Sequence, residues 1–336
     1  MDQTSNWDFF SRVVQPALDL APTTFLEDIS ASLSEAGIQE AVARHDSRPI
    51  YDWLLGLFQL QGISDAVAFS YTAKHGTVRW AEIEGALASS PDCHRLNSYW
   101  HFADCKYQKG ARICSEPHLL HRCHLPRHPL RNGRLSQAAY SLFFFIRDIC
   151  DGDLVGWIDR RLESADPGPR DRSRAVRMRH ALLEPMGRIF GVSNKVLSMV
   201  LADLLLVGDP SRERWVTTGG SMIAIDSLMH NLLHRTGVLH RFGAMHEIGP
   251  ACYLPGSCAS LIEGLARRID AHAYNPLFPS VFPRFIQHSL WSFCAGDKLS
   301  ICNGNRIDDT ARCRNQYCPA FDDCDRVSLR GIPSGF

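Results

Sequence analysis

Residues 189–207 read IFGVSNKVLSMVLADLLLV, and this stretch decides the fold. Gly191 can adopt a backbone conformation that is closed to other residues, and Ser193 or Asn194 suits the capping position of a helix. The residues that follow are apolar almost all round, which predicts a short turn leading into a buried helix. The amides at the start of such a helix suit the binding of a phosphate.

Lys195 falls in the first turn of this predicted helix, at the edge of its dry region. Desolvation and a helix N-terminus both favour a neutral amine, which is the nucleophilic form. The alternative is a solvated lysine on an ordinary helix, because short motifs that contain glycine recur by chance.

Residues 223–237, IAIDSLMHNLLHRTG, place Asp226 where the cap of a second helix belongs. In one interpretation the carboxylate only accepts hydrogen bonds from the first amides of that helix. In the other it also stabilises a developing positive charge, or orients a water or an amine for attack.

Composition limits the class of protein. The chain has 336 residues, is 45% hydrophobic and carries 36 basic against 36 acidic residues. Zero net charge argues against a strongly basic coat for nucleic acid, although not against a local basic face. The longest apolar runs are too short for a membrane helix, and the N-terminus lacks the layout of a secretory signal. We therefore expect a cytoplasmic protein that does not contact a membrane.

Helical spacing of apolar residues covers most of the chain: 48–87, 135–162 and 175 to about 270, apart from a polar loop at 208–220. There is no convincing run of alternating strand residues. These patterns predict an all-α protein.

Twelve cysteines are many for a reducing compartment, where clusters indicate metal ligation rather than disulfides. An insertion at 91–132 contains Cys105, Cys114 and Cys123 at intervals of nine residues, with His118, His121 and His124 nearby. It either binds a structural zinc ion within 93–128 or contains free thiols and histidines whose hydrogen-bonding groups are paired within the protein. Four more cysteines close the chain: Cys302, Cys313, Cys318 and Cys324.

The segments 189–207 and 223–237 resemble two segments of the helix-hairpin-helix DNA glycosylases. The stretch GVSNK is similar to the family's G-V-G-x-K, with Ser193 in place of the second glycine, and IAIDSLMHNLLHRTG is similar to its V-D-T-H-V-x-R-V-x-N-R-x-G. The resemblance implies that Lys195 and Asp226 are the catalytic pair and that Gly191, Ser193 and Asn194 contact DNA. The pair is 31 positions apart, and the resemblance treats 208–220 as an inserted loop. Residues 49–87 resemble the family's early segment, which makes Gln61 the wedge that replaces the flipped base; the alternative is an amide that caps a loop.

The resemblance implies two helical domains with the active site in the cleft between them. Residues 48–222 would form a six-helix barrel with the helix-hairpin-helix, and 1–47 with 223–336 a helical domain with the cysteine tail. The end of the tail, C-P-x-x-x-x-C, is similar to the family's iron–sulfur loop, so that the four tail cysteines would bind a [4Fe–4S] cluster, or zinc in the alternative. Cys294 competes with Cys302 as the first ligand, and Arg312 and Arg314 suit phosphate.

The implied function is excision of a damaged or modified base from double-stranded DNA by a monomer, with abasic-site lyase activity through a Schiff base at Lys195. One alternative keeps the fold and acts on enzymatically modified or bulky bases, as in defence against phage. Another is a DNA-binding module without catalysis that retains the hairpin as a phosphate clamp.

Overall fold

The computed structural model describes residues 3–58, 65–108, 111, 113–125, 134–303 and 307–330. Across these residues it contains helices and no strand, with one isolated antiparallel bridge between Gln108 and Ile113. The predicted all-α class is therefore confirmed. Within the same residues, no helix is both long and apolar enough to cross a membrane.

The chain divides into two compact units, one formed by Ile29–Thr218 and the other by Met1–Asp28 with Gly219–Phe336. The sequence prediction placed residues 29–47 in the second unit, whereas the structure places them in the first. The reason is local packing: Gln39 donates to the carbonyl of Val207, and the hydroxyl of Ser47 accepts the N–H of Leu154.

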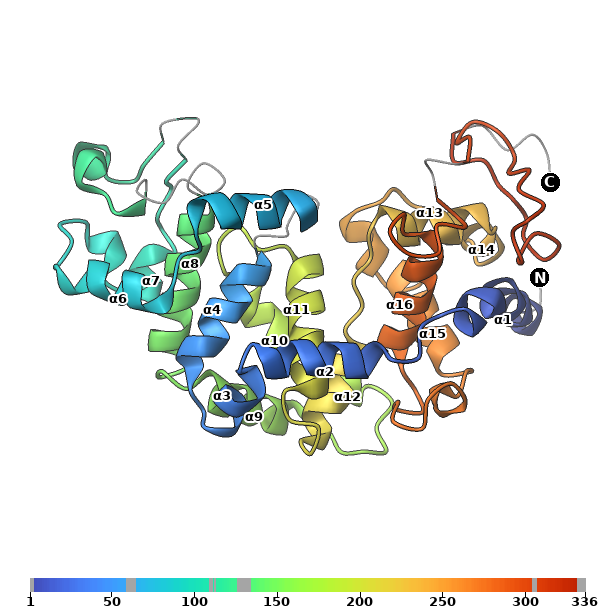
Figure 1. Cartoon of the computed structure of the whole chain (residues 1–336), viewed down its shortest axis with the longest axis horizontal. Helices are drawn as coiled ribbons and strands as arrows, with labels where there is room; N and C mark the ends of the chain where they lie inside the picture. The colour runs from blue at the N-terminus through green and yellow to red at the C-terminus, as the bar shows by residue number, and fades with distance from the viewer. Residues whose placement is uncertain are drawn as a thin grey trace. The chain divides into compact units, whose positions relative to one another are not determined.

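The unit Ile29–Thr218, here the hairpin unit, contains most of the helices. In chain order they are α3 (Ile38–Ala43), α4 (Ser47–Phe58), α5 (Asp65–His75), α6 (Trp80–Ala88), η1 (His94–Leu96), α7 (Tyr99–Phe102), η2 (Pro117–Arg122), α8 (Arg134–Phe144), the π-helical η5 (Phe145–Ile149), α9 (Leu154–Ala165), α10 (Arg174–Met186) and α11 (Asn194–Val207) (Figure 1). Two further helices, α2 (Phe25–Glu35) and α12 (Glu213–Ser221), cross its boundaries.

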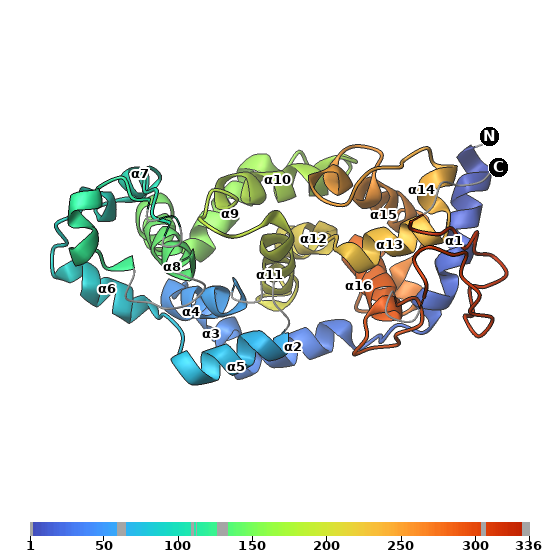
Figure 2. The same cartoon turned by 90° about the horizontal axis from the view of Figure 1, so that it is seen from above.

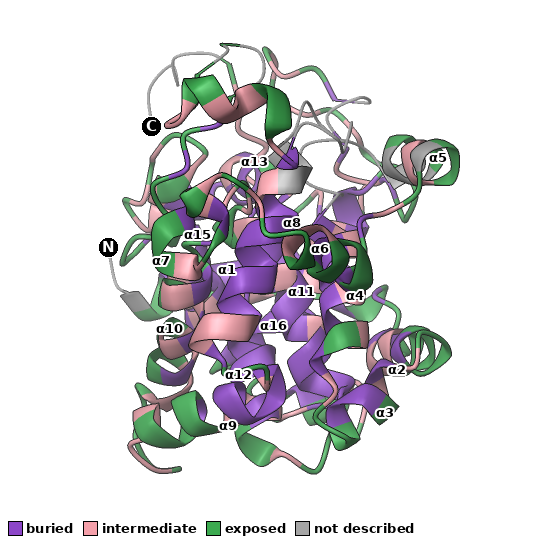
Figure 3. Cartoon of the chain, turned by 90° about the vertical axis from the view of Figure 1, so that its left-hand side faces the viewer, coloured by how far each residue is buried: buried purple, intermediate pink, exposed green. Residues whose placement is uncertain are grey.

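Helix α11 forms much of the core of the hairpin unit. It packs against α4 and α10, and most of its side chains are buried from Val196 to Val207, as the colouring of Figure 3 also shows. Tyr51 of α4 is fully buried as well, and its hydroxyl donates to the carbonyl of Ala139 at 3.0 Å. The prediction of a buried, apolar helix after the hairpin is confirmed.

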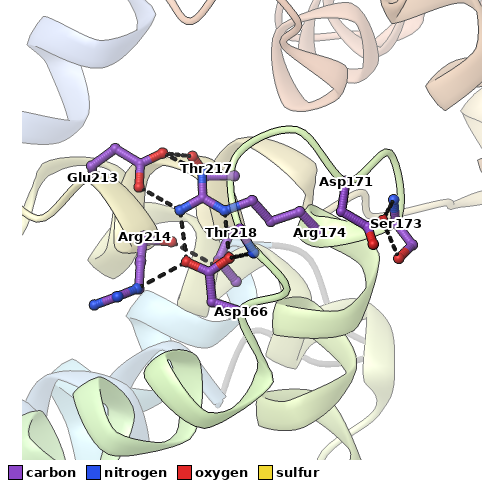
Figure 4. Close-up of polar contacts among 9 residues, drawn as sticks. Asp166, Asp171, Ser173, Arg174, Glu213, Arg214, Thr217 and Thr218 are labelled. Carbon is purple, nitrogen blue, oxygen red and sulfur yellow. Dashed lines mark hydrogen bonds and ion pairs between the residues drawn. The ribbon is translucent and has the colours of Figure 1, made fainter.

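Arg174, at the start of α10, ties α12 to the chain that follows α9. Its guanidinium donates to both carboxylate oxygens of Asp166 and to both of Glu213, with distances of 2.7–2.8 Å (Figure 4). The side chains of Arg174 and Asp166 are 12% and 8% exposed, whereas that of Glu213 is 63% exposed. Hydrogen bonds from Arg174 lower the pKa of both carboxyl groups.

The second unit, here the cysteine-tail unit, is built around its last helix, α16. Its elements are α1 (Gln3–Asp19), α13 (Ser227–Arg235), α14 (Val238–Arg241), η6 (Pro250–Tyr253), α15 (Cys258–Ala266), η7 (Ala271–Ala273) and α16 (Pro283–Cys294). Helices α1, α13 and α15 pack against α16, and Figure 2 shows α13 and α15 beside it. The aromatic rings of Phe278, Phe282 and Phe285 pack against one another at the start of α16, edge-on, tilted and stacked, and all three are buried.

Two expectations about local structure are wrong. The predicted polar loop at 208–220 contains α12, whose Trp215 is buried and donates to Asp159 at 2.7 Å. Conversely, the chain is not helical throughout 175–270, because a long connection separates α14 from α15 apart from the short η6. The prediction failed for α12 because its glycine, serine and threonine residues are typical of loops. The helix is anchored by one buried tryptophan.

We expect Asp166→Asn to lower the free energy of unfolding by about 3 kcal/mol at pH 7, because it removes the buried carboxylate that pairs with Arg174 and leaves this guanidinium only the exposed Glu213 carboxylate. Glu213→Gln is the matched control; it should cost at most about 1 kcal/mol, because water screens an exposed ion pair. The pKa of Asp166 is lower in the folded state, so its contribution is present above about pH 4 and is lost as the pH falls further. Urea denaturation of both variants at pH 7 and pH 3 measures this; equal losses for the two variants would contradict it.

Candidate functional site

A short turn joins α10 to α11 at the residues that the sequence singled out. Gly191 has a φ of +73°, in the left-handed region that favours glycine. Ser193 caps α11, and its hydroxyl accepts the N–H of Val196 at 3.5 Å. The ring of Phe190 packs edge-on against Phe102 and fixes the turn to the core. A helix, a tight turn and a second helix therefore lie in sequence here.

Lys195 lies at the boundary between an exposed and a buried stretch of chain. Gly191, Ser193 and Asn194 are exposed, Lys195 is half-buried, and burial begins at Val196. The lysine thus occupies the edge of a dry region, and a ligand can approach the turn from the solvent side.

Asp226 is the N-cap of α13, and its carboxylate accepts the N–H of Met229 at 3.0 Å. The preceding residue, Ile225, donates its N–H to the hydroxyl oxygen of Tyr253 at 2.9 Å. Burial raises the pKa of Tyr253, and the nearby charge of Asp226 raises it further. Asp226 is half-buried and belongs to the cysteine-tail unit, whereas Lys195 belongs to the hairpin unit.

The tail cysteines come together around one small cavity. Two arginines of the cysteine-tail unit, Arg235 and Arg326, line the same cavity, and its four cysteines are those predicted, namely Cys302, Cys313, Cys318 and Cys324. The Arg235 side chain is only 3% exposed and pairs with Asp309. Its Nη1 atom has no hydrogen-bond partner among the residues that the structure describes. The cavity therefore combines four sulfur atoms with buried positive charge.

Hydrogen bonds to sulfur add to this environment. The Cys324 sulfur accepts the N–H of Arg326 at 3.4 Å, and the Cys318 sulfur accepts the N–H of Ala320. Cys294 hydrogen-bonds to Cys302, which lowers the pKa of Cys302. Of these two residues, Cys302 is the one that lines the cavity, so the structure favours it over Cys294 as a ligand.

The tail is docked on the C-terminal end of α13. The N–H of Val327 donates to the carbonyl of Arg235 at 2.8 Å, and the N–H of Asp325 donates to that of Thr236 at 3.2 Å. Arg241 adds two hydrogen bonds of 2.7 Å to the Asp325 carboxylate. The cysteine cavity is thereby fixed to the helix that Asp226 caps.

The insertion also gathers its cysteines. Burial raises the pKa of Cys93, Cys105 and Cys123, and the charges of neighbouring cysteines raise it further. Each of the four sulfurs, including Cys114, accepts an N–H from the residue two positions later, the donors being Arg95, Tyr107, Glu116 and Leu125. Hydrogen bonds of this kind favour the thiolate, which is the form that binds metal. The regularly spaced three cysteines are thus joined by Cys93, at the start of the predicted range 93–128, while His118 and His121 are exposed.

A second group of possible metal ligands was not predicted. It consists of His230 in α13, His246 in the following connection, Cys252 in η6 and Cys258 at the start of α15, and their ligand atoms all lie within 4.8 Å of one another. A metal ion could bind there. The available signal was H-x5-C-x5-C at 246–258, which is diluted by the greater cysteine density elsewhere.

The remaining predicted DNA contacts are Gln61 and the pair Arg312 and Arg314. Gln61 lies outside the residues that the structure describes. Arg312 and Arg314 are exposed and line a surface hollow of the tail together with Tyr317, which is 97% exposed. The two arginines are therefore accessible to an anionic partner.

We expect Asp226→Ala to lower the free energy of unfolding by about 1 kcal/mol, because the first turn of α13 loses its cap. Asp226→Asn should be close to neutral, because asparagine caps helices as well as aspartate does. Thermal unfolding followed by circular dichroism measures both variants. A large loss for Asp226→Asn would mean that the negative charge, and not the cap, supports the fold.

Comparison with known proteins found no matching family model, no related curated protein and no similar solved structure.

Proposed function

We propose that this chain is a DNA glycosylase that flips a damaged or modified base out of duplex DNA and excises it. The observation that carries the proposal is the sequence of α10, an exposed turn and α11, with Lys195 directly after the turn. The arrangement supports it because an exposed helix start suits a phosphate and brings an amine to the same place.

Binding to the duplex would use local contacts, since the chain has no net charge. Gly191, Ser193 and Asn194 are exposed at the hairpin, and Arg312 and Arg314 are exposed on the tail. Guanidinium groups suit phosphate oxygens, and such contacts position a protein on DNA without reading its sequence. Because Lys195 and Asp226 belong to different units, the proposal requires one duplex to contact both units.

In the proposed reaction, the base leaves with the electrons of the glycosidic bond and takes up a proton. The Asp226 carboxylate stabilises the positive charge that develops on the deoxyribose. The neutral amine of Lys195 forms a bond to C1′ and loses a proton. Opening of the sugar, with a proton passing to the ring oxygen, gives a Schiff base between Lys195 and C1′. Removal of a C2′ proton then expels the 3′ phosphate and cuts the strand.

We propose that the tail cavity holds a [4Fe–4S] cluster. Such clusters are held by four cysteine thiolates and are tuned by hydrogen bonds to sulfur. The cavity offers Cys302, Cys313, Cys318 and Cys324, N–H donors to at least two of the sulfurs, and the buried Arg235 to balance negative charge. The cluster would hold the tail against α13 and supply no step of the base chemistry.

Lys195→Gln should abolish covalent trapping of the protein on DNA by borohydride, which reduces a Schiff base to a stable amine. Wild-type protein is incubated with duplexes that carry uracil, oxidised purines, bulky modified bases or an abasic site. The matched control is Lys74→Gln, which removes another lysine of the hairpin unit, exposed on α5, and should trap as the wild type does. Asp226→Asn should retain the fold but slow base release by at least about a hundredfold, as expected for loss of a group that acts in general acid–base chemistry.

Each outcome of this panel is decisive. Base release without a trapped adduct would remove Lys195 as the nucleophile and leave a monofunctional glycosylase. Adducts formed only with bulky modified bases would define the substrate class. Duplex binding with neither abasic product nor adduct on any substrate would contradict the glycosylase and favour a binding module.

Cys318→Ser should remove iron from the protein and bleach its visible absorption, because a cluster that loses one thiolate ligand is destabilised. The anaerobically purified wild type should contain about four iron atoms per tail site. Cys150→Ala is the control, because Cys150 is a buried cysteine of the hairpin unit, outside both cysteine clusters. Zinc in place of iron in the wild-type tail would contradict the cluster.

A further inference from the structure

Three N···S distances in the unpredicted group match those of a tetrahedral metal site, and all four ligand atoms lie within 4.8 Å of one another. His230 Nδ1 is 3.6 Å from the Cys252 sulfur and 3.5 Å from the Cys258 sulfur. His246 Nε2 is 3.4 Å from the Cys258 sulfur. A tetrahedron with Zn–S of about 2.3 Å and Zn–N of about 2.0–2.1 Å has N···S edges of about 3.5–3.6 Å.

Polar contacts are crowded in this group. The structure brings three N···S contacts together and also places Cys252 in hydrogen-bond contact with Cys258. The Cys258 sulfur approaches two imidazole nitrogens at once, and it can donate to only one of them. A cation at the centre satisfies all four atoms together.

The surroundings of the ligands also match a metal site. His246 Nδ1 lies 2.6 Å from the carbonyl oxygen of Ala244, so Nδ1 carries the proton and Nε2 presents its lone pair to the Cys258 sulfur. A carbonyl in this role orients metal-binding histidines and fixes their tautomer. His230, Cys252 and Cys258 are buried, and His246 is half-buried, so the site is closed.

The connection that carries two of the ligands has little hydrophobic core of its own. Between residues 243 and 256, Cys252 is the one buried residue, and Met245, Ile248 and Leu254 are 45%, 51% and 59% exposed. Such a segment needs an anchor other than apolar burial to remain ordered. Bonds from His246 and Cys252 to a shared ion provide one.

We propose that His230, His246, Cys252 and Cys258 bind one structural Zn²⁺ ion, and that this site positions Asp226. A closed site of two thiolates and two imidazoles is typical of structural zinc. Helix α13 carries both His230 and, four residues earlier at its cap, Asp226. Tyr253 follows the ligand Cys252 directly, and its hydroxyl oxygen holds the N–H of Ile225, the residue before Asp226. The positioning part rests on the proposed function, whereas the metal site does not.

The metal assignment is tested by elemental analysis of the full-length chain. His246→Gln should lower the zinc content by one equivalent relative to the wild type and leave the iron content unchanged. His246→Cys should keep that equivalent, because a thiolate can replace an imidazole as a ligand. His272→Gln is the matched control, since His272 is an exposed histidine of the same unit. Since only differences are compared, a zinc ion in the insertion does not affect the result.

Unchanged zinc in His246→Gln, or another metal lost in place of zinc, would overturn the assignment. If His246→Gln fails to fold, His246→Cys becomes the deciding measurement. Because His246 is only half-buried, a cysteine can be accommodated at this position. A folded, zinc-containing His246→Cys protein supports a ligand role, and one that folds without that equivalent contradicts it.

The positioning part is tested by Tyr253→Phe, which removes the acceptor for the Ile225 amide and leaves the ligands in place. Hydrogen exchange of residues 223–229 should become about tenfold faster, as loss of one hydrogen bond predicts, with zinc content unchanged. The rate of base release should fall by a similar factor while affinity for the duplex stays the same. Unchanged exchange would refute the link between Tyr253 and Asp226, whatever the activity; faster exchange with an unaltered rate would refute its role in catalysis.

Discussion

Helix α13 is the element on which the cysteine-tail unit depends, because three polar attachments meet on its nine residues and their N-cap. Asp226 caps its first turn, His230 faces two thiols in its middle, and the carbonyl of Arg235 at its end accepts the N–H of Val327 from the tail. Its apolar side packs against α16. A short helix has little stability of its own, so these attachments, together with packing, hold it in place.

The hairpin unit is stabilised differently. Helix α11 is buried along most of its length, and the turn before it is fixed by the packing of Phe190 against Phe102. Apolar burial therefore supports the candidate lysine, whereas hydrogen bonds and the contacts of His230 with two thiols support the helix that the candidate aspartate caps. The same contrast explains why the turn can remain exposed: the rigid helix behind it already restricts its conformation.

The sequence predicted the all-α class, the buried helix after the hairpin and the cap at Asp226, because periodicity and capping are local signals. It missed α12, whose burial depends on the contact of Trp215 with Asp159, a residue far away in the chain. It also missed the His230 group, because 15 residues separate His230 from His246 and only folding brings them together.

The poorly buried connection between α14 and α15 has a consequence for how the protein matures. If its order comes from a bound ion, the folding of that part is a mass-action equilibrium with the supply of metal. The helical core around α11, by contrast, is held by apolar burial. Newly made protein would thus pass through a state in which the hairpin unit is folded but the connection that contacts α13 is not yet ordered. Binding of the metal ion would be the last step of folding.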